Sequence, residues 1–157
     1  MLKAADIDAL EGTPKVHFLN PNARRLNKSL GDRAGLRGFG FHLIEVPPGC
    51  ESTEYHRHHH EDECTYVLSG TGEVRIGDDV IPIGPGDFIG YPAGGLAHTM
   101  RNTGADALRC IVVGQRLDHD VGDYPEKGLR IFRSVGLPWQ VVRHEDITSP
   151  GGGAGRK

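Results

Sequence analysis

The chain has 157 residues, which is the size of one domain and too short for two ordinary ones. With 25% charged and 37% hydrophobic residues, its composition is that of a globular protein. The formal net charge is only −3 and no basic run occurs, so neither nucleic acid nor an anionic membrane surface is an expected partner.

The N-terminal stretch "MLKAADIDALEG" mixes charged residues into its first turn and lacks the apolar core of a secretory signal. No apolar run approaches the roughly 20 residues that a membrane span needs. We therefore expect a cytoplasmic protein without membrane contact. Cys50, Cys64 and Cys110 are widely spaced and fit neither a disulfide framework nor a zinc site, which predicts buried free thiols.

Residues 1–37 predict an N-terminal arm. Within it, "DIDALEG" favours one helical turn, "KVHFLN" a short strand and residues 20–35 a polar loop.

From residue 38 the pattern changes, because short segments rich in β-branched and aromatic residues alternate with Gly, Pro and Asp. These segments predict strands at 39–46, 64–69, 72–76, 79–83, 87–90, 97–102 and 107–115. No long stretch with a helical period interrupts them, so residues 38–115 are predicted to form an all-β sandwich or barrel.

The C-terminal part, residues 116–148, predicts an arm that packs on the barrel. It begins with a polar connection over 116–128, and "LRIFRSV" and "WQVV" then favour two further short strands. Residues 149–157, "SPGGGAGRK", are expected to be a disordered tail.

The strand predicted around residues 63–69 carries apolar groups on both faces, because Val67 faces one way and Tyr66 and Leu68 the other. Such a strand needs a second sheet on one side and an arm or a partner subunit on the other. We expect a homodimer, the commonest symmetric assembly.

The segment "YHRHHHEDEC", residues 55–64, concentrates four histidines and three carboxylates. In an extended segment His56 and His58 share a face, and Glu63 and His98 can reach the same side from other strands. Three imidazoles with one carboxylate suit one divalent transition metal (Fe, Mn, Co, Ni, Cu or Zn) and not calcium. The competing interpretation is a solvated, charged hairpin with one core histidine.

Two motifs in the barrel region resemble those of the cupin superfamily. The first, G-x5-HxH-x3–4-E-x6-G, corresponds to Gly49, His56, His58, Glu63 and Gly70, with one extra residue after the first glycine. The second, G-x5-PxG-x2-H-x3-N, corresponds to a series with one extra residue before its histidine: Gly86, Pro92, Gly94, His98 and Asn102.

This resemblance implies a cupin jelly-roll double-stranded β-barrel in which His56, His58, Glu63 and His98 bind one divalent metal. The segment "DYPEKGLRIFR" is also similar to that of small bacterial single-domain cupins, some of them loosely described as sugar-phosphate-isomerase-like. Cupins include isomerases, dioxygenases, lyases and ligand-binding modules, so the fold does not define the reaction.

Other polar residues near the cluster have weaker interpretations. His59 and His60 fall outside the motif, and a shifted register using His58 and His60 leaves too few residues before Glu63. Glu61 and Asp62 are expected to be solvated, or to orient a ligand imidazole. Asp118, His119 and Asp120 ("DHD") are not expected to form a second metal site, and Arg75 and Arg101 are either anion-binding or simply solvent-facing.

The leading functional hypothesis is a metal-dependent enzyme of the isomerase, epimerase or lyase type. Its substrate is expected to be a small polar molecule that is sugar-like or carries a carboxylate, with the ion as Lewis acid. His60 and Tyr66 are the predicted proton-transfer residues. The alternatives are an Fe(II)-dependent dioxygenase and a non-catalytic cupin that binds a small ligand.

Overall fold

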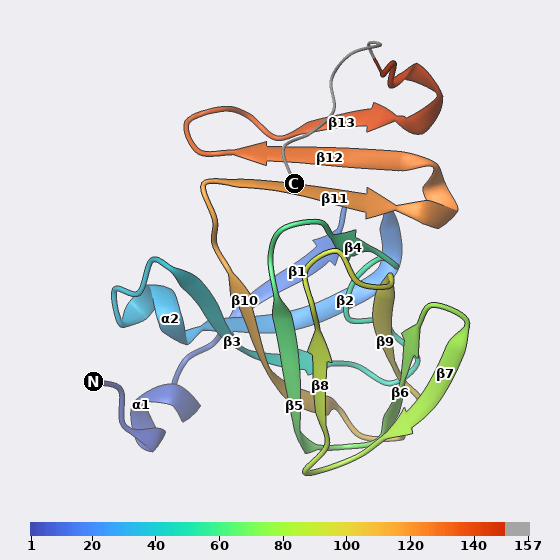
Figure 1. Cartoon of the computed structure of the whole chain (residues 1–157). Helices are drawn as coiled ribbons and strands as arrows, with labels where there is room; N and C mark the ends of the chain where they lie inside the picture. The colour runs from blue at the N-terminus through green and yellow to red at the C-terminus, as the bar shows by residue number, and fades with distance from the viewer. Residues whose placement is uncertain (150–157) are drawn as a thin grey trace.

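The computed structural model describes residues 1–149, which form mainly antiparallel strands (Figure 1). The largest sheet has six strands in the order β1-β2-β3-β10-β5-β8. Their bounds are β1 (Thr13–His17), β2 (Asn20–Ser29), β3 (Phe39–Val46), β10 (Leu108–Gln115), β5 (Glu63–Ser69) and β8 (Phe88–Tyr91).

Two smaller sheets complete the molecule. One has the order β7-β6-β9, with β7 (Asp79–Ile83), β6 (Gly72–Ile76) and β9 (His98–Asn102). The other, whose strands β11 to β13 lie across the upper end in Figure 1, has the order β13-β12-β11-β4, with β13 (Gln140–Arg143), β12 (Leu129–Ser134), β11 (His119–Tyr124) and β4 (Arg57–His58). The helical elements are short: α1 (Ala4–Asp8), α2 (Leu30–Arg33), η1 (Pro125–Lys127) and η2 (His144–Asp146).

The hydrophobic core lies between the six-stranded and the three-stranded sheets. Val46, Val67 and Leu108 of the large sheet pack with Val74 and Met100 of the small one, and all are buried. Each such side chain contributes roughly 1.5–3 kcal/mol to folding by leaving water. The all-β jelly-roll prediction is therefore confirmed, although the strands do not close into one hydrogen-bonded barrel within residues 1–149.

The seven strands predicted over residues 38–115 are present, and their bounds differ by at most one residue from the prediction. The expected helical turn and first short strand also occur, as α1 and β1. Of the three cysteines, only Cys110 is fully buried, and burial raises the pKa of its thiol to about 12. Cys50 and Cys64 are partly exposed.

Two predicted loops are wrong. Residues 20–29 form β2, which is hydrogen-bonded to β1 and β3, and residues 119–124 form β11 between β4 and β12. Both segments are polar, and periodicity of apolar residues finds only strands with an apolar face. Two polar side chains of β2, Arg25 and Asn27, instead line a cavity, and the acidic ones of β11 are buried in ion pairs. Residues 150–157, most of the predicted tail, lie outside the described residues.

Two residues of the sequence motifs have structural roles. Gly70 has φ +84°, and a Cβ there would lie 2.6 Å from the carbonyl oxygen of Ala107, so only glycine fits this turn. The buried Asn102 side chain donates to the carbonyls of Val46 and Asp106, at 2.7 and 2.8 Å. It thereby ties β9 to the loops that leave β3 and enter β10.

The outer face of the six-stranded sheet carries exposed apolar side chains. Tyr66 and Phe88 are register partners on β5 and β8 and are 44% and 67% exposed, and Leu68 lies beside them. This face agrees with the two-sided pattern of β5, and the homodimer stays a prediction. No helix of the described residues is long and apolar enough to span a membrane.

Candidate metal centre

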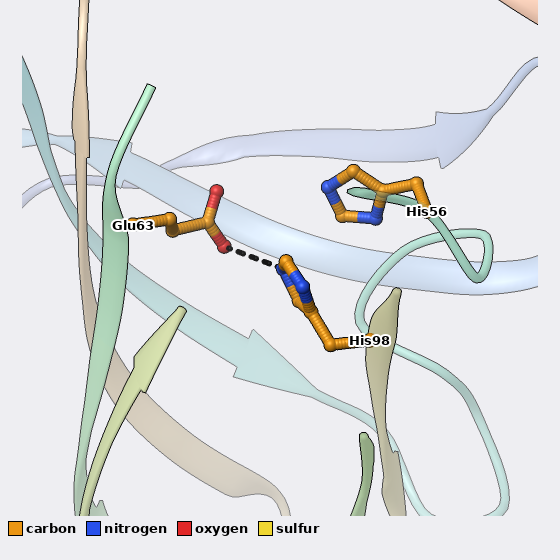
Figure 2. Close-up of side chains that lie close together, drawn as sticks. All are labelled: His56, Glu63 and His98. Carbon is orange, nitrogen blue, oxygen red and sulfur yellow. Dashed lines mark ion pairs between the residues drawn. The ribbon is translucent and has the colours of Figure 1, made fainter. Parts of the chain in front are cut away.

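Three of the four predicted metal ligands, His56, Glu63 and His98, come together at one end of the core, and His58 lies beside His56. His58 lies on β4 and His56 just before it, Glu63 begins β5, and His98 begins β9. An isolated bridge between His56 and His98, with mutual backbone hydrogen bonds of 2.7 and 3.1 Å, holds the β4 segment against β9. Figure 2 shows His56, Glu63 and His98 converging from three segments.

Donor atoms of three of these residues lie within reach of one ion, and His58 lies close to two of the three. One donor atom from each of His56, Glu63 and His98 lies within 4.8 Å of the others. The Nε2 atom of His58 lies 3.1 Å from Nε2 of His56 and 3.8 Å from Glu63 Oε2. The Glu63 carboxylate is also 3.8 Å from His98 Nε2, the contact that Figure 2 marks.

The tautomers of His56 and His58 direct two lone pairs at each other. His56 Nδ1 is 2.9 Å from the carbonyl oxygen of Glu54, and His58 Nδ1 is 2.8 Å from Asp120 Oδ2. Both of these partners only accept hydrogen bonds, and for His58 the 2.8 Å contact to Asp120 is shorter than the 3.3 Å contact of Nδ1 to the Arg133 guanidinium. We therefore assign the proton to Nδ1 in both rings, which leaves lone pairs on both Nε2 atoms. Two lone pairs 3.1 Å apart repel each other unless a cation lies close to both.

His98 supplies a second observation that a cation fits. Its side chain is almost fully buried, against the ring of Tyr91 at a centroid distance of 3.7 Å. Neither ring nitrogen has a hydrogen-bond partner among the described residues. An unpaired buried polar group costs about 1–3 kcal/mol, which a bound ion would offset. The residues present therefore fit a divalent metal.

The pKa values of the centre favour the ligand forms of these groups. Burial, reinforced by the neighbouring His98, lowers the pKa of His56 to about 3, so this imidazole is neutral at pH 7. Burial alone would raise the pKa of Glu63, but the neighbouring imidazoles of His98, His56 and His58 lower it to about 2. One carboxylate and neutral imidazoles are the forms that coordinate metals.

Two acidic residues, Asp120 and Glu61, lie near the Nδ1 side of the His58 ring. Asp120 and Glu61 are both buried, and Arg133 forms ion pairs with both. His58 Nδ1 lies 3.9 Å from Glu61 Oε2, in addition to its hydrogen bond to Asp120. The expectation that Glu61 is solvated is wrong. Asp120, of the "DHD" segment, orients an imidazole, in the way that carboxylates support metal-ligating histidines.

The centre opens into a cavity of about 570 Å³, a volume typical of small-molecule sites. Gly40 and Gly114 lie on its β3–β10 wall, beside Glu63. Arg133 and Trp139 also line the cavity, and the guanidinium lies over the indole ring at 5.6 Å.

Comparison with known proteins shows the family to which the chain belongs. A model of the cupin domain matches residues 42–114. A structure of a candidate sugar phosphate isomerase from Acidithiobacillus ferrooxidans is 51% identical, with 96% of each chain covered and a TM-score of 0.92. The chain belongs to the cupin superfamily. No curated protein matches this cupin.

Two further solved structures are similar to this cupin. A sugar phosphate isomerase of the cupin superfamily from Silicibacter pomeroyi is 25% identical, with a TM-score of 0.83 over 96% of this chain and 97% of the other. A structure described as an oxalate decarboxylase on prediction, from Thermotoga maritima, is 23% identical, with a TM-score of 0.58 over 74% of this chain and 99% of the other. The latter shows the fold alone.

The remaining histidines of the cluster face away from the centre of this cupin. His59 Nε2 lies 2.8 Å from Asp123 Oδ2. The same buried carboxylate accepts hydrogen bonds from Arg57 and Arg130, and His144 lies 3.2 Å from it. The alternation of an extended segment therefore separates His56 and His58 from Arg57 and His59.

The structure does not bring His60 and Tyr66 to the centre. His60 is exposed outside the cavity lining, and only its backbone N–H reaches inward, to Asp120 Oδ1. Tyr66 lies on the face of β5 opposite Glu63. Arg75 and Arg101 line a different hollow, and Arg75 stacks on Tyr55 at 4.1 Å.

Sequence reasoning missed several cavity residues. Arg25 and Asn27 on β2 and His42 on β3 face the cavity, together with Arg133 on β12. His42 alternates with Ile44 and Val46 on the inward face of a correctly predicted strand, so its position could have been found. The others depended on strands or contacts that the apolar pattern does not indicate.

Proposed function

We propose that this cupin is a metal-dependent enzyme of the isomerase or epimerase type that acts on a small, sugar-like molecule. The observation that carries the proposal is the pair of facing lone pairs on His56 and His58 beside the unpaired nitrogens of buried His98. His56, His58, Glu63 and His98 would hold the ion, which supplies Lewis-acid polarisation of substrate oxygens.

The names of two similar structures support this choice of reaction. Both are described as sugar phosphate isomerases, one of them as a candidate, and each matches nearly the whole length of this chain. A cavity of about 570 Å³ lined by polar and charged groups also suits a small polyhydroxylated molecule.

Isomerisation of a sugar needs a donor at the carbonyl oxygen as well as a base at carbon, and we assign the donor to His42. Its imidazole lines the cavity on the inward face of β3. Burial, and then the charge of Arg116, lower its pKa, which keeps the ring neutral at pH 7. Its Nδ1 lies 3.3 Å from the amide nitrogen of Asn27, which can only donate.

This contact defines where the ring proton lies. Because Asn27 donates to Nδ1, the neutral ring carries its proton on Nε2, which can donate a hydrogen bond to the substrate carbonyl oxygen as its charge develops. Nε2 lies close to Gly40, where a Cβ would approach it to 2.6 Å. Glycine at position 40 therefore leaves the room that this imidazole needs.

The test is solvent exchange in the full chain loaded with Mn(II) or Zn(II). Aldose and ketose substrates, free and phosphorylated, are incubated anaerobically in D2O, and loss of carbon-bound hydrogen is followed by NMR. We expect exchange that disappears on metal removal and falls about 100-fold or more in His42→Gln, in line with general acid–base catalysis. His60→Gln is the matched control and should keep the activity.

Other outcomes would replace the proposal. Consumption of O2 by the iron-loaded protein without exchange would support the dioxygenase alternative, because that chemistry needs few protein side chains. Ligand binding without turnover under either condition would support the non-catalytic binding module.

A further inference from the structure

The charged residues of the cavity are distributed unequally. On the β10–β12 side, Arg133 is paired with Glu61 and Asp120, and Arg116 with Asp32 at 2.5 Å. These arginines are neutralised by carboxylates of the protein itself.

The part of the cavity formed by β1 and β2 carries two cations without such partners. Arg25 and Lys15 are register partners on these strands and both line the cavity. Within residues 1–149, neither has a carboxylate oxygen within 4.0 Å of its charged nitrogens. The guanidinium of Arg25 donates only to the carbonyl of Ser52, which leaves most of its five N–H groups available.

Burial makes this uncompensated charge costly. Arg25 is half-buried, and burial lowers its pKa, while Glu63 across the cavity acts in the opposite direction. Glu63 is, however, a predicted metal ligand, and its charge is then balanced by the ion. Lys15 is exposed at the rim, so it adds a second positive charge that a ligand can reach from solvent.

We propose that Arg25 and Lys15 form the binding site for the phosphate group of the substrate, at the β1–β2 wall of the metal cavity. A phosphate monoester carries nearly two negative charges at pH 7, which matches one guanidinium and one ammonium. Arginine binds phosphate oxygens through its planar fork of donors, and lysine acts as a point charge. This inference rests on the proposed function, because it makes the substrate a phosphorylated sugar.

The location also explains why the N-terminal strands belong to the six-stranded sheet. β1 and β2 extend the sheet beyond β3, so their inward residues Lys15, Arg25 and Asn27 become a wall of the site. A substrate held there by its phosphate would place its remaining oxygens toward His42 and the metal ligands, which line the same cavity.

The first experiment measures inorganic phosphate binding to the full chain by calorimetry. We expect Arg25→Gln to weaken binding about 10- to 100-fold, the range for a charge-assisted hydrogen bond, and Lys15→Gln about 3- to 10-fold. Arg25→Lys should recover part of the affinity. Arg24→Gln is the matched control, because Arg24 is exposed and its side chain donates to Pro21.

A second measurement separates this inference from the metal assignment. His98→Ala should lose the metal yet still bind phosphate, whereas Arg25→Gln should keep the metal and lose phosphate. If phosphate affinity is unchanged in both Arg25→Gln and Lys15→Gln, the phosphate site is overturned while the metal centre stands. Acetate bound as tightly as phosphate would also overturn it, since the site would then select carboxylates.

Discussion

This cupin has two neighbouring histidine clusters. They differ in whether their polar atoms already have hydrogen-bond or ion-pair partners within the protein. His59 and His144 surround the buried carboxylate of Asp123 together with two arginines, so polar atoms there find partners within the protein. The imidazoles of His56, His58 and His98 instead face one another around a single carboxylate. One cluster stabilises the fold, and the other is arranged for a cation.

A local concentration of histidines in the sequence therefore does not by itself define a metal site. His58 and His59 are neighbours in the sequence, but the extended backbone sends them to opposite clusters. Each ring bonds to a carboxylate that is already paired with arginine, so what distinguishes them is the other contact of His58: its Nε2 lies 3.1 Å from Nε2 of His56.

Substitution of the two neighbours separates the clusters most strongly. His58→Ala should lose most of the bound metal, because one of the four donors disappears. His59→Ala should retain it, since its imidazole contacts Asp123 and not the centre. Metal content by elemental analysis of both purified variants checks this, and equal retention would break the distinction between the clusters.

Loss of Asp123 tests the structural cluster. Asp123→Asn should reduce the free energy of unfolding by about 3 kcal/mol at pH 7, because it removes a buried carboxylate and leaves two half-buried arginines without it. Urea denaturation measures this change. Metal content should stay that of the wild type, and a wild-type stability would contradict the assignment.

The pH dependence of the free energy of unfolding provides a further test of the role of Asp123. Burial would raise the pKa of Asp123, but hydrogen bonds from Arg130, His59 and Arg57 hold it well below its usual range. A folded pKa below the unfolded value of about 3.9 means that this stabilisation is present above about pH 4 and is lost as the pH falls further. The difference between wild type and Asp123→Asn should therefore shrink in denaturation curves measured at pH 3.

Asp120 links the two kinds of cluster, because it is buried like Asp123 yet orients a predicted metal ligand. Asp120→Asn replaces the charged acceptor that keeps the proton of His58 on Nδ1 by a neutral amide. We expect metal affinity to fall about 10- to 100-fold, the range for groups that orient metal ligands. Competition titration against a fluorescent chelator measures this. An unchanged affinity would show that Arg133 and Glu61 suffice to orient the ring.

The smallest effect is expected at Tyr66. Its side chain lies on the outer face of β5, away from Glu63 and the cavity. Tyr66→Phe should change the exchange activity by less than about twofold, because surface positions away from a site contribute little. A larger loss in the NMR assay would restore Tyr66 as a proton-transfer residue.

Much of this architecture was predictable from the sequence, and the failures have one physical cause. The strands of residues 38–115 alternate apolar and polar residues, so their positions and the convergence of His56, Glu63 and His98 could be inferred. β2 and β11 are stabilised by pairing with neighbouring strands and by charges, which leave no apolar period.

Contacts between distant segments were also beyond the sequence pattern. Asp120 meets His58 across 62 residues, and Arg133 reaches Glu61 across 72, so neither pair forms a local motif. The cavity role of Arg25 likewise became visible only when β2 was placed beside β3.

The most direct test of the metal centre is anomalous scattering from a crystal of protein that was purified without exposure to a chelator or a nickel column. We expect one peak in contact with Nε2 of His56, His58 and His98 and with the Glu63 carboxylate. A second group of possible donors exists at His58, Glu61 and Asp120, but Arg133 already places a positive charge there. A peak at that second group would contradict this metal assignment. So would the absence of a peak at the predicted position in protein whose elemental analysis shows metal.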